Sequence, residues 1–135
     1  MALAVRLLVL ETDMRVAIIG ASNNRKKFGN KAVRSYLEQG HEVVPINPTE
    51  TSIEGLRAYA RIADVPGEID RALLYVPPAV GIGLLPELAA KRVKEVYVNP
   101  GAESEELFER ASQLGLNTVF ACAIVDIGDT PARHP

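Results

Sequence analysis

Five short apolar runs alternate along this chain with segments whose apolar residues recur at helical spacing. Most of the runs end at glycine, proline or asparagine, which favour turns. Continuous apolar strands separated by helices are typical of a parallel sheet covered on both faces. The sequence therefore predicts an α/β domain, a three-layer αβα sandwich whose five parallel strands occupy residues 16–19, 42–46, 72–76, 95–98 and 117–121.

The connections between these runs predict the helices and the strand order. Helices are expected around residues 32–37, over 79–92 and over 103–114, with a shorter one within 59–65. Right-handed crossovers in a Rossmann-like arrangement favour the order 3-2-1-4-5 for the predicted strands. That order would place a ligand crevice outside the C-terminal ends of the first and fourth strands.

Length and composition fit one domain. The chain has 135 residues, and 47% of them are hydrophobic, which is ample for a single core. We expect this domain over residues 14–125, preceded by an extension (1–13) and followed by an irregular tail (126–135). A net charge of −2 argues against a general nucleic-acid binder, and the single cysteine suits a reducing, cytoplasmic location.

The apolar run at the start of the chain, residues 2–10, is about half the length that spans a bilayer. It lacks the charged leader and the small-residue cleavage site of a secretory signal, so no membrane or secretory role is expected. Met14 directly precedes the first predicted strand. Residues 1–13 are therefore interpreted either as an extension from an upstream start codon or as an added edge strand or short helix.

The first predicted strand runs into a loop suited to a phosphate group. Gly20 can adopt backbone conformations closed to other residues and lets a ligand approach closely. The loop then offers polar donors and a run of positive charge before the next helix begins. We interpret this stretch as a pyrophosphate-binding turn, with Ser22, Asn23 and Asn24 as donors and Arg25, Lys26 and Lys27 as cations.

The loop departs from the strict dinucleotide fingerprint, G-x-G-x-x-G followed by an acid at the end of the second strand. Ser22 stands at the second glycine position, the next glycine is Gly29, and the neutral Asn47 ends the second strand. These departures argue against ordinary NAD binding. They also leave open a plain reading, in which the segment is a solvated strand-to-helix loop whose basic residues face water.

Turn residues follow every predicted strand at the same edge of the sheet. Because parallel strands end together, these residues should converge on one rim. The convergence is stronger support for a ligand site than any single motif. The rim consists of Gly20-Ala21-Ser22, Asn47-Pro48, Val76-Pro77-Pro78, Asn99-Pro100-Gly101 and Cys122.

The ordered set of these motifs resembles a known family. G-A-S before a basic loop and G-N is followed by V-x-P-I-N-P, I-x-G, a strand ending in P-P, N-P-G before an acidic helix, and a late cysteine. This order is similar to that of the small stand-alone CoA-binding proteins. Those proteins are related to the CoA-binding domain of succinyl-CoA synthetase α subunits and of ADP-forming acyl-CoA synthetases. The resemblance covers residues 14–125.

The resemblance implies coenzyme A, or an acyl-CoA, as the ligand. Carried over by position, it places the diphosphate at Gly20, Ala21 and Ser22, with Lys27, Phe28, Gly29 and Asn30 shaping the far side of the loop. Asn47 and Pro48 would line the adenosine side. Val76, Pro77 and Pro78 would flank the diphosphate or the start of the pantetheine arm, near Asn99, Pro100 and Gly101. The positive charges of Arg25, Lys26, Lys27 and Arg34 would meet the phosphates.

No catalytic constellation is recognised, so we expect a binding, carrier or regulatory module and no enzyme. His41 and His134 do not resemble phosphoryl carriers, and no metal-ligand set accompanies the acidic residues. Cys122 could meet the CoA thiol, but a small buried hydrophobe is the favoured interpretation; Tyr75 could contact a ligand or fill the core. The alternatives are a minimal NAD(P)-dependent oxidoreductase and an interaction subunit with a vestigial site. An acyltransferase or ligase partner and a homodimer are expected associations.

Overall fold

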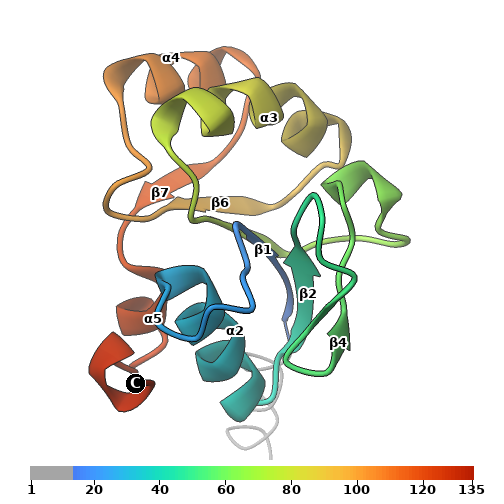
Figure 1. Ribbon diagram of the computed structural model, residues 1–135. Coiled ribbons are helices and arrows are strands. Elements are labelled where there is room, and N and C mark those ends of the chain that lie inside the picture. Colours follow the sequence, from blue (N-terminus) through green and yellow to red (C-terminus); the bar gives the residue numbers. More distant parts are fainter. Residues whose placement is uncertain (1–13) are drawn as a thin grey trace, which may run out of the picture.

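The computed structural model describes residues 14–135, so the predicted extension over residues 1–13 lies outside the described residues. A five-stranded, wholly parallel sheet runs through the middle of the molecule (Figure 1). The prediction of an α/β domain around such a sheet is confirmed. The strands, in the order in which they lie across the sheet, are β2 (Glu42–Ile46), β1 (Arg15–Ile19), β5 (Arg71–Leu74), β6 (Glu95–Val98) and β7 (Thr118–Phe120).

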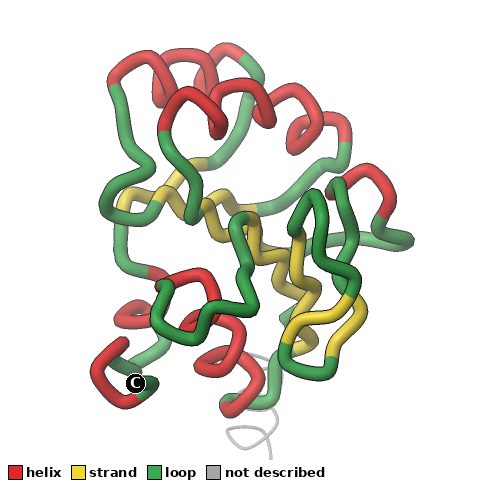
Figure 2. The backbone as a smooth tube through the Cα atoms, viewed as in Figure 1, coloured by secondary structure: helices red, strands yellow, loops and turns green. Residues whose placement is uncertain are grey.

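Helices cover both faces of this sheet, which gives the predicted three layers (Figures 1 and 2). Helices α3 (Pro78–Ala90) and α4 (Glu105–Gln113) pack on one face, and α2 (Phe28–Glu38) and α5 (Ala123–Asp126) on the other. Alternate residues of each strand face opposite cores because side chains alternate along a strand. In β1, Ala17 and Ile19 belong to the α3/α4 core, whereas Val16 and Ile18 belong to the α2/α5 core.

The predicted strand order was wrong in one respect. The third strand, β5, pairs with β1 and does not lie beyond β2, so the observed order is 2-1-3-4-5 in sequence terms. Pro45 gives the physical reason: it has no N–H to donate, and a proline is tolerated at the edge of a sheet but not at its centre. β2 is accordingly the edge strand, and Pro45 lies opposite Ile18 of its one sheet partner.

The new order moves the point at which the strand sequence reverses. After β2 the chain crosses back past β1, so the reversal lies between β1 and β5 and not between the first and fourth strands as predicted. In open parallel sheets the ligand crevice forms at such a reversal, outside the C-terminal ends of the strands. The residues that follow β1 and β5 therefore occupy the position where a ligand site is expected.

The connection between β2 and β5 contains a small hairpin and one helical turn. β3 (Ser52–Ile53) and β4 (Leu56–Arg57) pair antiparallel around Gly55, which belongs to the I-x-G motif. The short helix predicted within residues 59–65 is a single 3₁₀ turn, η1 (Ile62–Asp64). The N–H of Tyr59 donates to the carbonyl of Pro45 at 3.0 Å, which covers part of the free edge of β2.

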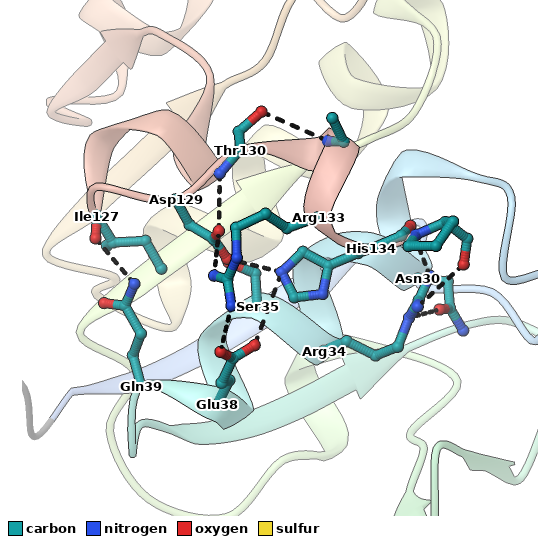
Figure 3. Close-up of polar contacts among 12 residues, drawn as sticks. Asn30, Arg34, Ser35, Glu38, Gln39, Ile127, Asp129, Thr130, Arg133 and His134 are labelled. Carbon is teal, nitrogen blue, oxygen red and sulfur yellow. Dashed lines mark hydrogen bonds and ion pairs between the residues drawn. The ribbon is translucent and has the colours of Figure 1, made fainter.

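The prediction of an irregular tail after residue 125 was wrong. A 3₁₀ turn, η2 (Pro131–Arg133), follows α5, and the 127–135 segment is fastened to α2 by side-chain hydrogen bonds (Figure 3). Asp129 is the centre of this attachment: its Oδ2 lies 2.6 Å from Ser35 Oγ and 2.7 Å from His134 Nε2, and its Oδ1 accepts from Arg133 at 2.7 Å. The composition of the segment gave no indication that it packs against α2.

Replacing Asp129 with asparagine is expected to lower the free energy of unfolding by about 2 kcal/mol at neutral pH, because hydrogen bonds to an ionised group are lost. Burial alone would raise the pKa of Asp129, but hydrogen bonds from Ser35, His134, Thr130 N–H and Arg133 hold that pKa well below its ordinary value. A pKa lowered by folding stabilises above the ordinary carboxyl pKa, and this contribution is lost as the pH falls.

The wild-type protein should therefore lose stability below about pH 4 more steeply than the Asp129→Asn variant. Urea unfolding of both proteins at a series of pH values checks this. Parallel stability curves for the two proteins between pH 5 and pH 2 would contradict the assignment.

Candidate functional site

A pocket of about 680 Å³ opens at the C-terminal edge of the sheet, at the reversal between β1 and β5. One wall is the loop that joins β1 to α2, and the opposite wall is formed by the segments that follow β5 and β6. With Asn47, which follows β2, four separate parts of the sequence thus meet around one space. The lining residues are Gly20, Ala21, Ser22, Lys26, Lys27, Phe28, Gly29, Asn47, Tyr75, Val76, Pro77, Pro100, Gly101 and Ala102.

Two glycines allow the loop and helix α2 to pack against the sheet. Gly20 has a φ of +93°, and a Cβ there would lie 2.3 Å from the carbonyl oxygen of Tyr75. At Gly29 a Cβ would lie 2.1 Å from the carbonyl oxygen of Gly20. These are the roles of the first and last glycines of a dinucleotide-binding turn. Eight residues separate the two positions, so the loop is longer than that of the strict fingerprint.

The pocket is electrostatically suited to an anion. Helix α2 begins at Phe28 with no side-chain cap and no acidic residue in its first turn, so its N-terminal partial positive charge is not neutralised locally. Lys26 and Lys27 line the same pocket, and within residues 14–135 neither forms an ion pair. A helix N-terminus beside free lysines is a common arrangement for binding phosphate.

Asparagine side chains hold the loop in place. Asn47 donates from Nδ2 to the carbonyl of Ala21 at 2.9 Å, while its Oδ1 accepts from the backbone N–H of Thr49 and of Glu50. Asn30, which is fully buried, donates to the carbonyl of Ser22 at 2.7 Å. The two amides fix opposite sides of the Gly20–Ser22 turn.

Asn23 and Arg25 contact the segment that holds the β3–β4 hairpin. Asn23 Nδ2 donates to Glu50 Oε2 at 2.9 Å and to the carbonyl of Ser52 at 3.0 Å. Arg25 forms an ion pair with Glu54 at 3.4 Å. The hairpin therefore supports the outer side of the loop, and the Arg25 charge is partly compensated by Glu54.

A second, apolar pocket of about 320 Å³ lies on the other side of the same turn. It shares Gly20 and Val76 with the first pocket, so the two pockets are neighbours at the ends of β1 and β5. Charge enters its lining only through Arg61 and Glu87, which pair with each other at 3.4 Å. The other lining residues are Ile19, Ile46, Pro48, Ala60, Ile62, Val80 and Leu84.

Most of the residues predicted to form the site are brought together here. Twelve of the 19 predicted residues line the first pocket, and Pro48 lines the second. Asn23, Arg25 and Asn30 support the loop from outside the pockets, as described above. Asn99 is buried and bridges the carbonyl of Leu74 and the N–H of Ala123, and Pro78 begins α3. Cys122 lines neither pocket and precedes α5 with a partly exposed side chain.

Tyr75 and Ala102 also line the first pocket, although neither was among the predicted site residues. For Tyr75 the sequence had left two roles open, contact with a ligand or packing in the core, and its place directly after a buried strand at the predicted rim was a signal for the first. Its Oη is buried and has no hydrogen-bond partner among the residues that the structure describes. Burial raises the pKa of Tyr75, with a smaller contribution from the nearby Cys122, so the phenol stays protonated.

Within residues 14–135, no helix has the length and apolar character that crossing a membrane requires. Glu38, Asp129 and His134 each have one side-chain atom that could bind a metal ion, and these three atoms lie within 4.8 Å of one another. However, the guanidinium of Arg133 donates to both carboxylates, at 2.7 Å in each case, so the positive charge between them is that of Arg133. This cluster fastens the 127–135 segment.

Comparisons with known proteins agree with the geometry. A family model described as "CoA binding domain" matches residues 14–127. The acetate–CoA ligase (ADP-forming) II subunit alpha of Pyrococcus furiosus is 33% identical over 115 residues, which are 77% of this chain and 25% of that subunit. This chain thus spans about a quarter of the length of that relative.

Smaller relatives are covered almost entirely. The uncharacterized protein YneT of Bacillus subtilis is 20% identical over 116 residues, 86% of each chain. The solved structure of a conserved hypothetical protein from Pyrococcus furiosus aligns with a TM-score of 0.78 and 34% identity, covering 84% of this chain and 98% of that one. The resemblance that the ordered motifs indicated is confirmed, and the chain belongs to the CoA binding domain family.

Proposed function

We propose that this protein binds coenzyme A, or an acyl-CoA, across the two neighbouring pockets at the ends of β1 and β5. The observation that carries the proposal is that a lysine-lined pocket and an apolar pocket lie next to each other and share Gly20 and Val76. CoA has a charged diphosphate between an adenosine group and a pantetheine arm. A ligand of that kind needs an anion site adjacent to an apolar one.

The diphosphate is assigned to the Gly20–Ser22 turn and the start of α2. Gly20 and Gly29 allow close approach of the backbone, and the uncapped helix N-terminus supplies N–H donors. Lys26 and Lys27 supply the compensating charge. Asn47, at the position where a dinucleotide dehydrogenase has an acid for the ribose, is committed to the carbonyl of Ala21. These features favour CoA over NAD.

The adenine is assigned to the apolar pocket, and the pantetheine arm to the wall formed by Val76, Pro77 and Pro100–Ala102. The apolar pocket is of the size that suits a planar base, and Pro48 and Ile62 provide apolar faces. The pantetheine wall offers backbone and small apolar surface, as a flexible arm with two amides requires. The reactive thiol or thioester would lie at the open end of the first pocket.

The protein is proposed to act as a carrier or regulatory module, not as an enzyme. The titratable side chains lining the two pockets are Lys26, Lys27, Tyr75, Arg61 and Glu87. Lys26 and Lys27 are assigned to the phosphates, Tyr75 is held protonated, and Glu87 accepts from the N–H of Ala63 and pairs with Arg61. Chemistry on the acyl group is assigned to a partner of the ligase or acyltransferase class.

Isothermal calorimetry of the reduced protein with CoA, acetyl-CoA, NAD and ATP tests the proposal. We expect micromolar binding of CoA and acetyl-CoA and no heat with NAD. Binding of NAD without CoA would revive the oxidoreductase alternative and overturn the proposal. Silence with all four ligands, together with a stable protein partner, would favour an interaction subunit with a vestigial site.

A further inference from the structure

Arg34 lies outside both pockets and connects the proposed diphosphate loop to a distant part of the chain. It lies on α2, and its guanidinium donates to four oxygen atoms (Figure 3). Nε donates to Asn30 Oδ1 at 2.8 Å, and Nη2 donates to the carbonyl of Arg25 at 2.8 Å. The other two acceptors are the oxygens of His134 and Pro135, at 3.1 and 3.2 Å.

The first two contacts fix the loop from behind. Asn30 links Arg34 to the turn, because its Oδ1 accepts from Arg34 while its Nδ2 donates to the carbonyl of Ser22. The Arg25 carbonyl precedes Lys26 and Lys27, so holding it orients the backbone that carries both pocket lysines. Arg34 thus holds the loop near its beginning, through Asn30 and Ser22, and close to its end, at the Arg25 carbonyl. It lines neither pocket.

The other two contacts fix Arg34 itself. The 127–135 segment that supplies them is attached to α2 through Asp129, Arg133 and His134 (Figure 3). Arg133 Nη2 donates to Glu38 Oε1 at 2.7 Å, one turn beyond Arg34 on the same helix. The segment therefore presents two oxygens at a fixed place, and a planar guanidinium can meet both pairs of acceptors at once.

We propose that Arg34 is a positioning residue that holds the CoA diphosphate loop in its binding conformation, with the 127–135 segment as its anchor. The inference rests on the proposed function. A loop that occupies the competent conformation only part of the time binds more weakly in proportion to that fraction. Loss of the hydrogen bonds between Arg34 and the loop should therefore weaken CoA binding even though Arg34 lines neither pocket.

The decisive variant is Arg34→Lys, which keeps the positive charge but cannot reach four acceptors with one flat group. We expect the Kd for CoA to rise about tenfold, as it would if the competent loop fell to about a tenth of the population. Backbone amides of Asn24, Lys26 and Lys27 should exchange with solvent faster in the ligand-free variant. Arg34→Gln should match Arg34→Lys in both measurements.

Arg15→Gln is the matched control. Arg15 begins β1, at the end of the strand opposite the loop, and it likewise donates to backbone carbonyls, those of Pro66 and Glu68; it also pairs with the carboxylate of Glu42. Its loss should lower stability but leave the CoA Kd and the loop exchange rates unchanged. Equal weakening of CoA binding by Arg15→Gln would show general destabilisation and overturn the inference.

Two other results would also overturn it. Wild-type affinity in Arg34→Lys with weak binding in Arg34→Gln would mean that Arg34 contributes charge alone. Unchanged hydrogen-exchange rates of the loop amides in both variants would mean that Arg34 does not hold the loop. If the wild-type protein fails to bind CoA, the proposed function fails, and the exchange rates still decide whether Arg34 positions the loop.

Discussion

Replacing Gly20 with alanine is expected to lower the free energy of unfolding by about 3 kcal/mol and to abolish CoA binding. The φ of +93° at this position is unfavourable for any residue with a side chain, and that strain alone costs about 1–2 kcal/mol. A Cβ would also lie 2.3 Å from the carbonyl oxygen of Tyr75. That carbonyl cannot retreat easily, because the Tyr75 N–H donates to Ile19 at 2.8 Å. Overpacking therefore adds a further cost of similar size.

Gly40 provides a control with almost the same backbone conformation. Its φ is +89°, but a Cβ there would meet no atom within 4 Å. The Gly40→Ala variant should lose only about 1 kcal/mol and should keep its CoA affinity. Denaturant unfolding and calorimetry of both variants make the comparison. Equal destabilisation by the two substitutions would contradict the close approach between the loop and the end of β5.

The layers of the fold were predictable because they depend on local patterns. Apolar runs and helical spacing located all five strands and the three long helices, and these patterns are set by side-chain burial within each element. Strand order depends partly on which strands can lie at the edge of the sheet. Pro45 carried that information, since its missing N–H favours the edge position that β2 occupies.

The position of the candidate site could be predicted from the sequence, but the hydrogen-bond partners of its polar side chains could not. Parallel topology brings strand ends together whatever the side chains are, so the rim formed as expected. Sequence gives the type of a polar residue and not the direction of its side chain. Asn30, Asn47 and Arg34 resembled ligand-binding groups, yet their hydrogen bonds go to the backbone of the loop and of distant segments. Two of the four acceptors of Arg34, the oxygens of His134 and Pro135, are 100 and 101 residues away in the chain, beyond any local pattern.

Replacing Lys26 and Lys27 together with alanine is expected to weaken CoA binding about a hundredfold while leaving stability almost unchanged. Both side chains are exposed, line the first pocket, and form no ion pair within residues 14–135 that folding would lose. A hydrogen bond from a charged donor to a phosphate contributes about 1.5 kcal/mol at the low end, so two such bonds correspond to roughly a hundredfold in Kd.

The control removes the same charge elsewhere. Lys94 and Arg110 are exposed and pair with Asp70 and Glu106, away from both pockets. Their double replacement with alanine should change CoA affinity by less than about threefold, because exposed charges at a distance are screened by salt. Calorimetry at low and high salt separates the two effects: the pocket lysines should matter at both, and long-range charge only at low salt. If both double variants weaken CoA binding equally, the phosphates are not held by Lys26 and Lys27, and the positive charge of the loop acts only as a diffuse attraction.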